Sequence, residues 1–184
     1  TRSQARRTAR MNTTPHSPYA FIAIEGNIGA GKTTFAKLLA RELHWPMVEE
    51  HARRHPAVIN GQVNEETFDA LHESQTEAAA DVARAGHAGV VCDTGDLVLR
   101  MWSEQVLGFS WHPLSPPWPS VDLHILCPTL DVWEEDPLRS MPRLEDRLAL
   151  EAQYRAHLEH RHHLVAEGDT PEARVAHILA QWPW

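Results

Sequence analysis

The sequence predicts an α/β fold in which a five-stranded, mostly parallel sheet carries helices on both faces. Short apolar runs alternate along the chain with longer amphipathic stretches, and this alternation is typical of parallel sheets crossed by helices. The chain has 184 residues, of which 42% are hydrophobic and 23% charged. These values suit one domain with a full core.

The expected strands are short apolar runs bounded by glycine, proline or acidic residues. Such runs are buried on both faces when the sheet is parallel. The last candidate could instead continue the helix before it. In chain order the candidates are Ala20–Glu25, Met47–Val48, Gly89–Asp93, Val121–Cys127 and Leu164–Ala166.

The expected helices begin at capping residues and carry apolar side chains at helical spacing. Asn64 caps one helix, and Thr170 with Pro171 opens the last one in the favoured order of cap and first residue. Leu148 is expected on the apolar face of a charged helix. The expected ranges are 33–43, 64–82, 96–107, 143–161 and 171–181.

A glycine-rich segment lies between the first expected strand and the first expected helix. Its residues fit the pattern G-x-x-x-x-G-K-[ST] without a gap. The glycines permit backbone shapes in which successive N–H groups point at a phosphate, and the helix N-terminus adds partial positive charge. This phosphate loop predicts a P-loop NTPase fold that binds a nucleotide. It consists of Gly26, Asn27, Ile28, Gly29, Ala30, Gly31, Lys32 and Thr33.

Three side chains of this segment have expected roles toward ATP and Mg²⁺. Lys32 is expected to reach the β- and γ-phosphates and to act in catalysis. Thr33 is expected to place its hydroxyl on Mg²⁺, and Thr34 to contact the α-phosphate. The motif alone leaves open whether the protein is a kinase, an ATPase or a GTPase.

Residues 1–18 differ from the rest of the chain because they contain four arginines and no acid. We interpret them as a disordered arm, as a remnant of expression cloning or as an extension before a start at Met11. The remainder, 19–184, then has 13 basic and 25 acidic residues, a formal charge of −12. Such an acidic body argues against a nucleic-acid-binding surface.

Neither a membrane span nor a disulfide framework is expected. The chain lacks an apolar run near the roughly 18 residues that a spanning helix needs. Its two cysteines, Cys92 and Cys127, lie in separate apolar runs without metal-type spacing, and this usage favours a reducing compartment. We therefore expect a cytoplasmic protein; the sequence leaves its oligomeric state open.

Several stretches resemble known P-loop kinases. Residues 24–34, IEGNIGAGKTT, resemble the deoxynucleoside kinases. Most of the chain is more similar to the ribosylnicotinamide kinase domain of the bacterial NAD-biosynthesis regulator and to related AAA-type ATPases. The stretches that carry this likeness are Glu50–Arg53 (E-x-x-R), Cys92–Thr94 (D-T), 133–140 with Asp146–Arg147 (the lid), and Gly168–Asp169.

The resemblance implies a strand order of 2-3-1-4-5 and a lid around 136–147. It also implies that Arg139 and Arg147 act in catalysis by stabilising charge on the transferring phosphoryl group. Arg143, in the same four-residue row, and Asp169 are expected to contact the nucleotide. The alternative for the arginines is a basic helical face paired with neighbouring acids.

Acids at the ends of two expected strands are candidates for the chemistry. Asp93 is expected to hold Mg²⁺ or orient the acceptor hydroxyl, although it could also be a helix cap. Glu49 and Glu50 follow the second strand, and one of them could be a general base or both a solvated pair. Glu50 matches the E-x-x-R element, so we expect it in catalysis and, with Arg53, in substrate binding.

Polar and aromatic residues elsewhere have two interpretations each. Gln75, on the apolar face of the helix 64–82, could read a base or a carboxamide in the substrate pocket, or be a satisfied residue at the core edge. The tryptophans at 102, 111 and 118 could wall a substrate or cover a satellite core. The histidines at 157, 160, 162 and 163 fit a solvated face better than a metal site.

The function expected from these features is ATP-dependent phosphorylation of a small nucleoside-like acceptor, with nicotinamide riboside as the favourite. A deoxynucleoside or specialised-metabolite kinase is the alternative within kinases. A nucleotide-switched binding ATPase is the alternative of a different class.

Overall fold

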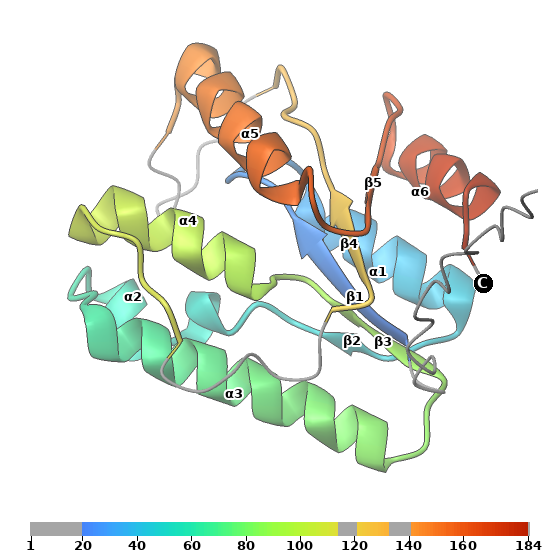
Figure 1. Cartoon of the computed structure of the whole chain (residues 1–184), viewed down its shortest axis with the longest axis horizontal. Helices are drawn as coiled ribbons and strands as arrows, with labels where there is room; N and C mark the ends of the chain where they lie inside the picture. The colour runs from blue at the N-terminus through green and yellow to red at the C-terminus, as the bar shows by residue number, and fades with distance from the viewer. Residues whose placement is uncertain (1–19, 114–120, 133–140, 184) are drawn as a thin grey trace, which may run out of the picture.

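A computed structural model describes residues 20–113, 121–132 and 141–183 of the chain (Figure 1). The predicted arm 1–18, Trp118 and the stretch 133–140 with Arg139 lie outside the described residues. Five strands form one sheet in the order β2-β3-β1-β4-β5, and every neighbouring pair is parallel. The predicted fold class and strand order are therefore confirmed. The strands are β1 (Ala20–Glu25), β2 (Met47–Val48), β3 (Gly89–Cys92), β4 (Leu123–Leu126) and β5 (His163–Val165).

Helices cover both faces of the sheet, with α1 and α6 on one side and α3 and α4 on the other (Figure 1). A 3-10 turn and a short helix follow β2, and α5 precedes β5. Their bounds are α1 (Lys32–Leu43), η1 (His51–Arg54), α2 (Pro56–Ile59), α3 (Glu65–Arg84), α4 (Asp96–Leu107), α5 (Leu144–Leu158) and α6 (Pro171–Ala180). No described helix is long and apolar enough to cross a bilayer.

The side chains of β1 alternate between the two cores. Ile22 and Ile24 face α1 and α6 and belong to the larger cluster of buried residues. Phe21 faces α3 and packs in a second cluster with residues of β2 and β3. Because both faces are covered, the strand is a continuous apolar run, as expected for a parallel sheet.

The predicted helix starts are confirmed by their hydrogen bonds. Asn64 accepts from the backbone N–H of Thr67, and the Thr67 hydroxyl accepts from the backbone N–H of Asn64, which completes a capping box. At α6 the Thr170 hydroxyl accepts from Ala173 N–H. These local bonds need no tertiary partner, so the sequence predicts them well.

The end of the charged helix differs from the expected range 143–161. Helix α5 ends at Leu158, and the stretch that follows is strand β5, which decides the alternative left open for 164–166. Leu148 is 50% exposed, because Leu150 and Leu158 define the buried face and Leu148 lies on the opposite side of the helix. The expectation for Leu148 was therefore wrong.

Candidate nucleotide and acceptor site

The phosphate loop follows β1 directly and ends in the first turn of α1. Gly26, Gly29 and Gly31 have φ angles of 136°, 78° and 78°, a region that favours glycine. A Cβ added to Gly26 would lie 2.6 Å from the carbonyl oxygen of Cys127, so the close approach of β4 also requires glycine there. No side chain caps α1 at Gly31. The helix thus starts with backbone donors that an anion can satisfy.

Two side chains of the loop form hydrogen bonds with neighbouring residues. The Lys32 ammonium donates to the carbonyl oxygen of Asn27 at 2.9 Å, which folds the side chain over the loop. The Thr33 hydroxyl donates to Oδ2 of Asp93 at 2.7 Å. Thr34 is exposed on α1. Thr33 and Asp93, the two residues expected to hold Mg²⁺, are therefore in direct contact.

Asp93 is a buried acid, and only one of its two carboxylate oxygens accepts a hydrogen bond from the described residues. It is 1% exposed, and Oδ1 has no hydrogen-bond partner in the described part of the chain. Burial raises the pKa of the Asp93 carboxyl, and the hydrogen bond from Thr33 offsets part of this effect. A carboxylate oxygen without a partner beside a hydroxyl is a donor set that suits Mg²⁺. These two residues therefore fit the metal that the phosphate loop implies.

A pocket opens beside the phosphate loop on the side of α4 and α5. Lys32 and the first four loop residues form one wall, so a molecule in this pocket lies next to the position of a bound phosphate. The other walls are largely apolar and aromatic. The lining residues are Gly26, Asn27, Ile28, Gly29, Lys32, Glu50, Ala52, Arg53, Val58, Val98, Leu99, Trp102, Gln105, Leu150 and Tyr154.

Of the two acids that follow β2, only Glu50 lines this pocket. Arg53 Nε donates to Glu50 Oε2 at 3.0 Å within the turn η1, and the Glu50 side chain is 21% exposed. Glu49 instead pairs with Arg54, and both of these side chains are more than half exposed. The structure therefore separates the two acids into one at the pocket and one at the surface.

Gln75 lies away from the pocket in which it was predicted to act. Its side chain faces the sheet from α3, and Nε2 donates to the carbonyl oxygen of Thr94 at 3.1 Å. It lines a second cavity together with His72 and Thr94, and Lys32 and Glu50 do not reach that cavity. Helical spacing puts Gln75 on the same buried face as Leu71 and Ala79. The sequence alone could not tell which part of the protein this face contacts.

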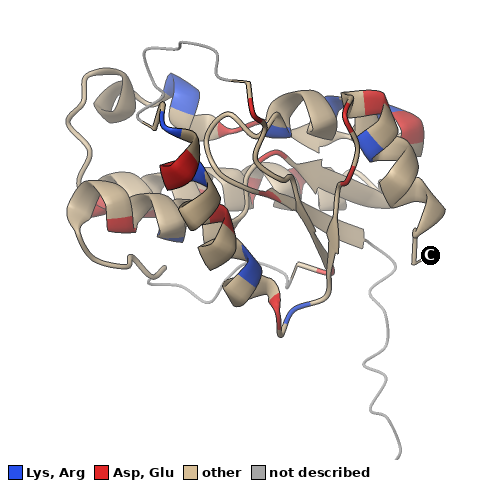
Figure 2. Ribbon diagram, turned by 90° about the horizontal axis from the view of Figure 1, so that it is seen from above, with Lys and Arg blue, Asp and Glu red and all other residues tan. Residues whose placement is uncertain are grey.

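The arginines of the predicted lid lie in different environments. Arg143 is exposed and pairs with Glu145 at 2.7 Å. Arg147 is 1% exposed, and Nη1 donates to the carbonyl oxygen of Leu130 at 2.7 Å. Figure 2 shows acidic and basic residues interspersed along α5, so this helix carries charges of both signs. Asp169 is exposed on the loop after β5.

The loop that follows β4 is fastened to the phosphate loop. Asn27 Nδ2 donates to the Thr129 hydroxyl at 2.8 Å and to the carbonyl oxygen of Arg147 at 2.7 Å. Thr129 N–H donates to Glu151 at 2.6 Å. Burial alone would raise the pKa of Glu151, but the hydrogen bonds from Thr129 and Arg155 hold it below its usual value. Glu151 is therefore a charged anchor for this loop.

A buried pair next to the phosphate loop escaped the sequence analysis. Glu25, the last residue of β1, is fully buried, and Oε1 lies 2.9 Å from Nδ1 of His124 on β4. A Cβ on Gly95 would lie 2.6 Å from the same Glu25 oxygen, so β3 also turns closely over it. The available signal was a polar side chain within each of two largely apolar runs, Glu25 in 20–25 and His124 in 121–127.

The tryptophans divide between the two interpretations. Trp111 is 1% exposed, packs against Phe68 and donates from Nε1 to Asp69, so it belongs to a satellite core. Trp102 also contacts Phe68 but lines the pocket.

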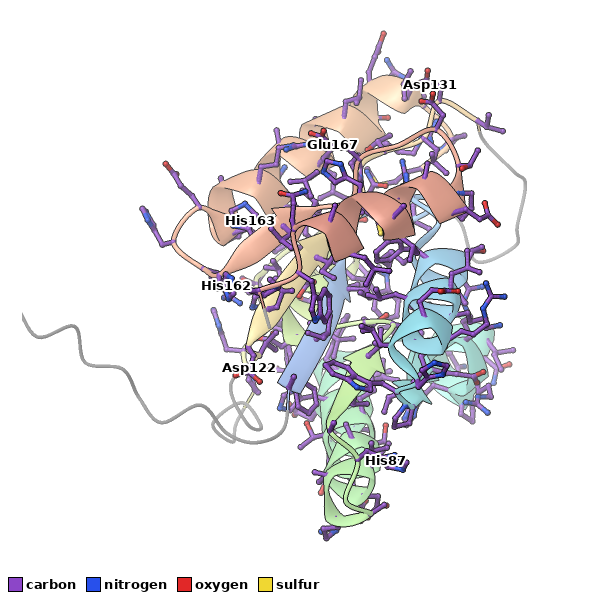
Figure 3. All side chains as sticks on the ribbon, turned by 90° about the vertical axis from the view of Figure 1, so that its right-hand side faces the viewer. His87, Asp122, Asp131, His162, His163 and Glu167 are labelled. Carbon is purple, nitrogen blue, oxygen red and sulfur yellow. The ribbon has the colours of Figure 1, made fainter. Side chains whose placement is uncertain are left out.

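One of the predicted histidines lies at the end of the strands opposite the pocket. There, Nδ1 of His162 donates to the carbonyl oxygen of Asp122, and Figure 3 labels both residues.

Comparisons with known sequences agree with this geometry. A profile of the family described as the AAA domain matches residues 21–173. A shikimate kinase from Thermosynechococcus vestitus is 32% identical over 172 residues, which cover 89% of this chain and 90% of that protein. A deoxyguanosine kinase from Bacillus subtilis is 50% identical over 46 residues, which cover 25% of this chain and 20% of that protein.

Solved structures share the fold. A deoxyadenosine kinase from M. mycoides with bound dCTP superposes with a TM-score of 0.60 at 13% identity, over 87% of this chain and 97% of that one. The NadR protein in complex with NAD and AMP-PNP superposes with a TM-score of 0.63 at 18% identity, over 89% of this chain. This chain spans about half of NadR, 49% of its length.

Proposed function

Because this chain belongs to the AAA domain family and is a P-loop kinase, we propose that it transfers the γ-phosphoryl group of ATP to a hydroxyl of a small nucleoside-like acceptor. The single observation that carries this proposal is the shared wall between the two halves of the site. Lys32 belongs to the phosphate loop and also lines the pocket that contains Glu50 and Arg53. An acceptor in the pocket therefore lies next to the transferring group.

The chain's own groups would act mainly by positioning and by charge. The backbone N–H groups of the phosphate loop and the Lys32 ammonium bind the phosphates of ATP. Thr33 and Asp93 would hold Mg²⁺, which neutralises charge on the β- and γ-phosphates when it is bound. The oxygen of the acceptor hydroxyl bonds to the γ-phosphorus as the bond to the β,γ-bridging oxygen breaks, ADP leaves, and the hydroxyl proton passes by way of Asp93 to the solvent.

Asp93 and Glu50 have different roles in this proposal. Asp93 is in contact with Thr33, so it serves the metal and orients the acceptor hydroxyl. Glu50 lines the pocket and is paired with Arg53, so this pair binds the acceptor. Arg139 and Arg143 are proposed to approach the phosphates from the lid, with Asp169 near the nucleotide.

The walls of the pocket favour an acceptor with an aromatic base. Trp102 and Tyr154 offer ring surfaces, and Leu99 adds an apolar one. The nicotinamide ring of nicotinamide riboside is a cationic aromatic group, and such groups bind well over aromatic faces. It therefore stays the favourite, with a deoxynucleoside or a specialised metabolite as the alternative.

A second candidate acceptor comes from the relative that matches almost the whole chain, the shikimate kinase. Shikimate is a carboxylate that carries hydroxyl groups, and binding it calls for cations. Among the described residues that line the pocket, the cations are Lys32 and Arg53, and Arg53 already pairs with Glu50. The charges of the pocket therefore favour the nucleoside-like acceptor.

A screen that measures ADP release tests the proposal. The purified protein with ATP and Mg²⁺ is offered ribonucleosides, deoxynucleosides, nicotinamide riboside and shikimate, each with a matched reaction lacking the acceptor. We expect strong stimulation by a nucleoside-like acceptor. Stimulation by shikimate alone would contradict the proposed acceptor class. Hydrolysis that no acceptor stimulates would favour the nucleotide-switched ATPase.

Such a kinase would work where ATP is abundant, so we propose a cytoplasmic protein that acts on a small molecule. We propose no nucleic-acid or membrane partner. The acidic balance of the chain, with a formal charge of −8, supports this view.

A further inference from the structure

Arg174 is a buried arginine in the first turn of α6, on the side of the sheet opposite the acceptor pocket. It is 6% exposed. Its guanidinium donates to three backbone carbonyl oxygens: Nε to Gly168 at 3.0 Å, Nη1 to Ala30 at 3.0 Å and Nη2 to Pro128 at 3.4 Å. Ala30 belongs to the phosphate loop and lies 144 positions away in sequence.

The positive charge of Arg174 is balanced by carbonyl groups and not by an acid among the residues that the structure describes. No carboxylate within the described ranges forms an ion pair with it, although exposed arginines such as Arg84 and Arg155 have one each. Burying a charge is costly unless hydrogen bonds compensate for it. Here the compensating groups are carbonyl dipoles, so the charge acts on the backbone of the loops that it touches.

The three carbonyls belong to three loops at the carboxyl ends of β1, β4 and β5. Figure 3 shows two of these loops by their labelled residues Asp131 and Glu167, at the end of the strands away from Asp122. Gly168 has a φ of 139°, and a Cβ there would lie 3.0 Å from the backbone of Ala173. The loop after β5 is thus packed directly on the first turn of α6, which carries Arg174.

The contact with Ala30 has a consequence for phosphate binding. The carbonyl oxygen of Ala30 and the N–H of Gly31 belong to the same peptide unit. A hydrogen bond from a cation to the oxygen polarises that unit and makes its N–H a stronger donor. Gly31 is the N-cap of α1 and lies in the segment whose N–H groups are expected to face a phosphate.

We propose that Arg174 is a positioning residue for the nucleotide. It fixes the phosphate loop against the loops after β4 and β5, and it polarises the Ala30–Gly31 peptide toward the phosphates. A planar guanidinium can serve three carbonyls at once, which an ammonium cannot do in the same geometry. This inference rests on the proposed function, because it takes ATP to be the ligand of the phosphate loop.

The experiment compares wild-type protein with R174K and R174Q, and uses R84K as a matched surface control. Calorimetric titrations measure the binding of MgATP and of magnesium tripolyphosphate, a probe that lacks the nucleoside. For R174Q we expect both affinities to fall roughly tenfold, the loss typical of one charge-assisted hydrogen bond. R174K keeps the positive charge but lacks the planar guanidinium with its several donors, so its affinities should fall less than those of R174Q. The KM for the acceptor should stay unchanged.

The outcomes separate a positioning role from a structural one. A structural role would lower the melting temperature of the free protein but leave the affinity of the folded fraction for tripolyphosphate unchanged, and this result would overturn the inference. If R174Q does not fold, R174K decides, and wild-type affinity for both probes in R174K would overturn the inference. A wild-type protein that binds no MgATP would instead refute the proposed function.

Discussion

The phosphate loop and the acceptor pocket meet at Lys32, but they are built in different ways. The loop is one contiguous segment, Gly26–Thr33, and the groups that it offers to a phosphate are mainly backbone N–H groups at glycine-dependent angles. The pocket collects side chains from η1, α2, α4 and α5, which lie between Glu50 and Tyr154 in the sequence. A contiguous backbone site depends on local conformation, whereas an assembled site depends on how distant elements pack.

This difference predicts different responses to mutation. Changes in the phosphate loop should affect catalysis with any acceptor and leave the fold intact. Changes in the pocket should depend on which neighbour each side chain also supports.

Replacing Lys32 with alanine should have the largest effect. Within the described part of the chain, the Lys32 ammonium donates to the loop carbonyl of Asn27, and Lys32 is not part of either core cluster around β1. We expect kcat to fall by at least about a hundredfold, since a charge aimed at the transferring group is lost. Steady-state kinetics measure this, with circular dichroism as the control for folding. Normal turnover in a folded K32A protein would refute the role of the phosphate loop.

The next effect separates the two acids. Asp93→Asn should lower kcat by roughly a hundredfold and leave the acceptor KM nearly unchanged, because a neutral amide is a poor ligand for Mg²⁺. Glu50→Gln should mainly raise the acceptor KM, about tenfold, because the amide replaces a charged partner in the pocket. Both are measured with the acceptor that the screen identifies. The reverse pattern would make Glu50 the general base and Asp93 a substrate ligand.

Mutations of two tryptophans distinguish the pocket from the core behind it. Trp111→Ala should destabilise the protein by about 3–5 kcal/mol, because the side chain is buried and bonded to Asp69. Trp102→Ala should cost less stability but raise the acceptor KM, because Trp102 lines the pocket. Chemical denaturation and kinetics measure the two effects. A larger loss of stability in W102A than in W111A would contradict this division.

Ligand binding should stabilise the folded protein through the phosphate loop. At a hundredfold excess over the dissociation constant, MgATP should add about 2.7 kcal/mol to the free energy of unfolding. Removing the metal with EDTA should reduce this gain, because Thr33 and Asp93 fit Mg²⁺. A thermal-shift assay with ATP, with MgATP and with neither tests both statements. No response to any nucleoside triphosphate would refute them.

The smallest effect is expected at the chain start. Deleting residues 1–18 should change neither kcat nor the melting temperature, because this segment has no apolar periodicity with which to pack. The truncated and full-length chains are compared in the same assays. An inactive or unfolded truncation would show that the segment supports one of the two regions.

Packing decided several properties of the site that residue patterns left open. Gln75 and Arg147 both have polar side chains on helices, and the sequence left open for each a role at the site or a structural role. Gln75 bonds to Thr94, and Arg147 is buried against Leu130. Both contacts depend on which face of a helix meets the rest of the protein. That choice is made by the sum of many burial contacts and not by the residue itself.

Sequence patterns sufficed to predict the phosphate loop, four of the five strands and the helix caps, because these depend on residues close together in the chain. The packing of distant elements was needed to show that Glu49 pairs with Arg54 outside the pocket, that Trp102 faces the pocket and that Arg174 reaches Ala30. The physical reason is the sequence distance over which each contact forms. Arg174 and Ala30 are 144 residues apart, and the residues around each of them in the sequence do not indicate the contact.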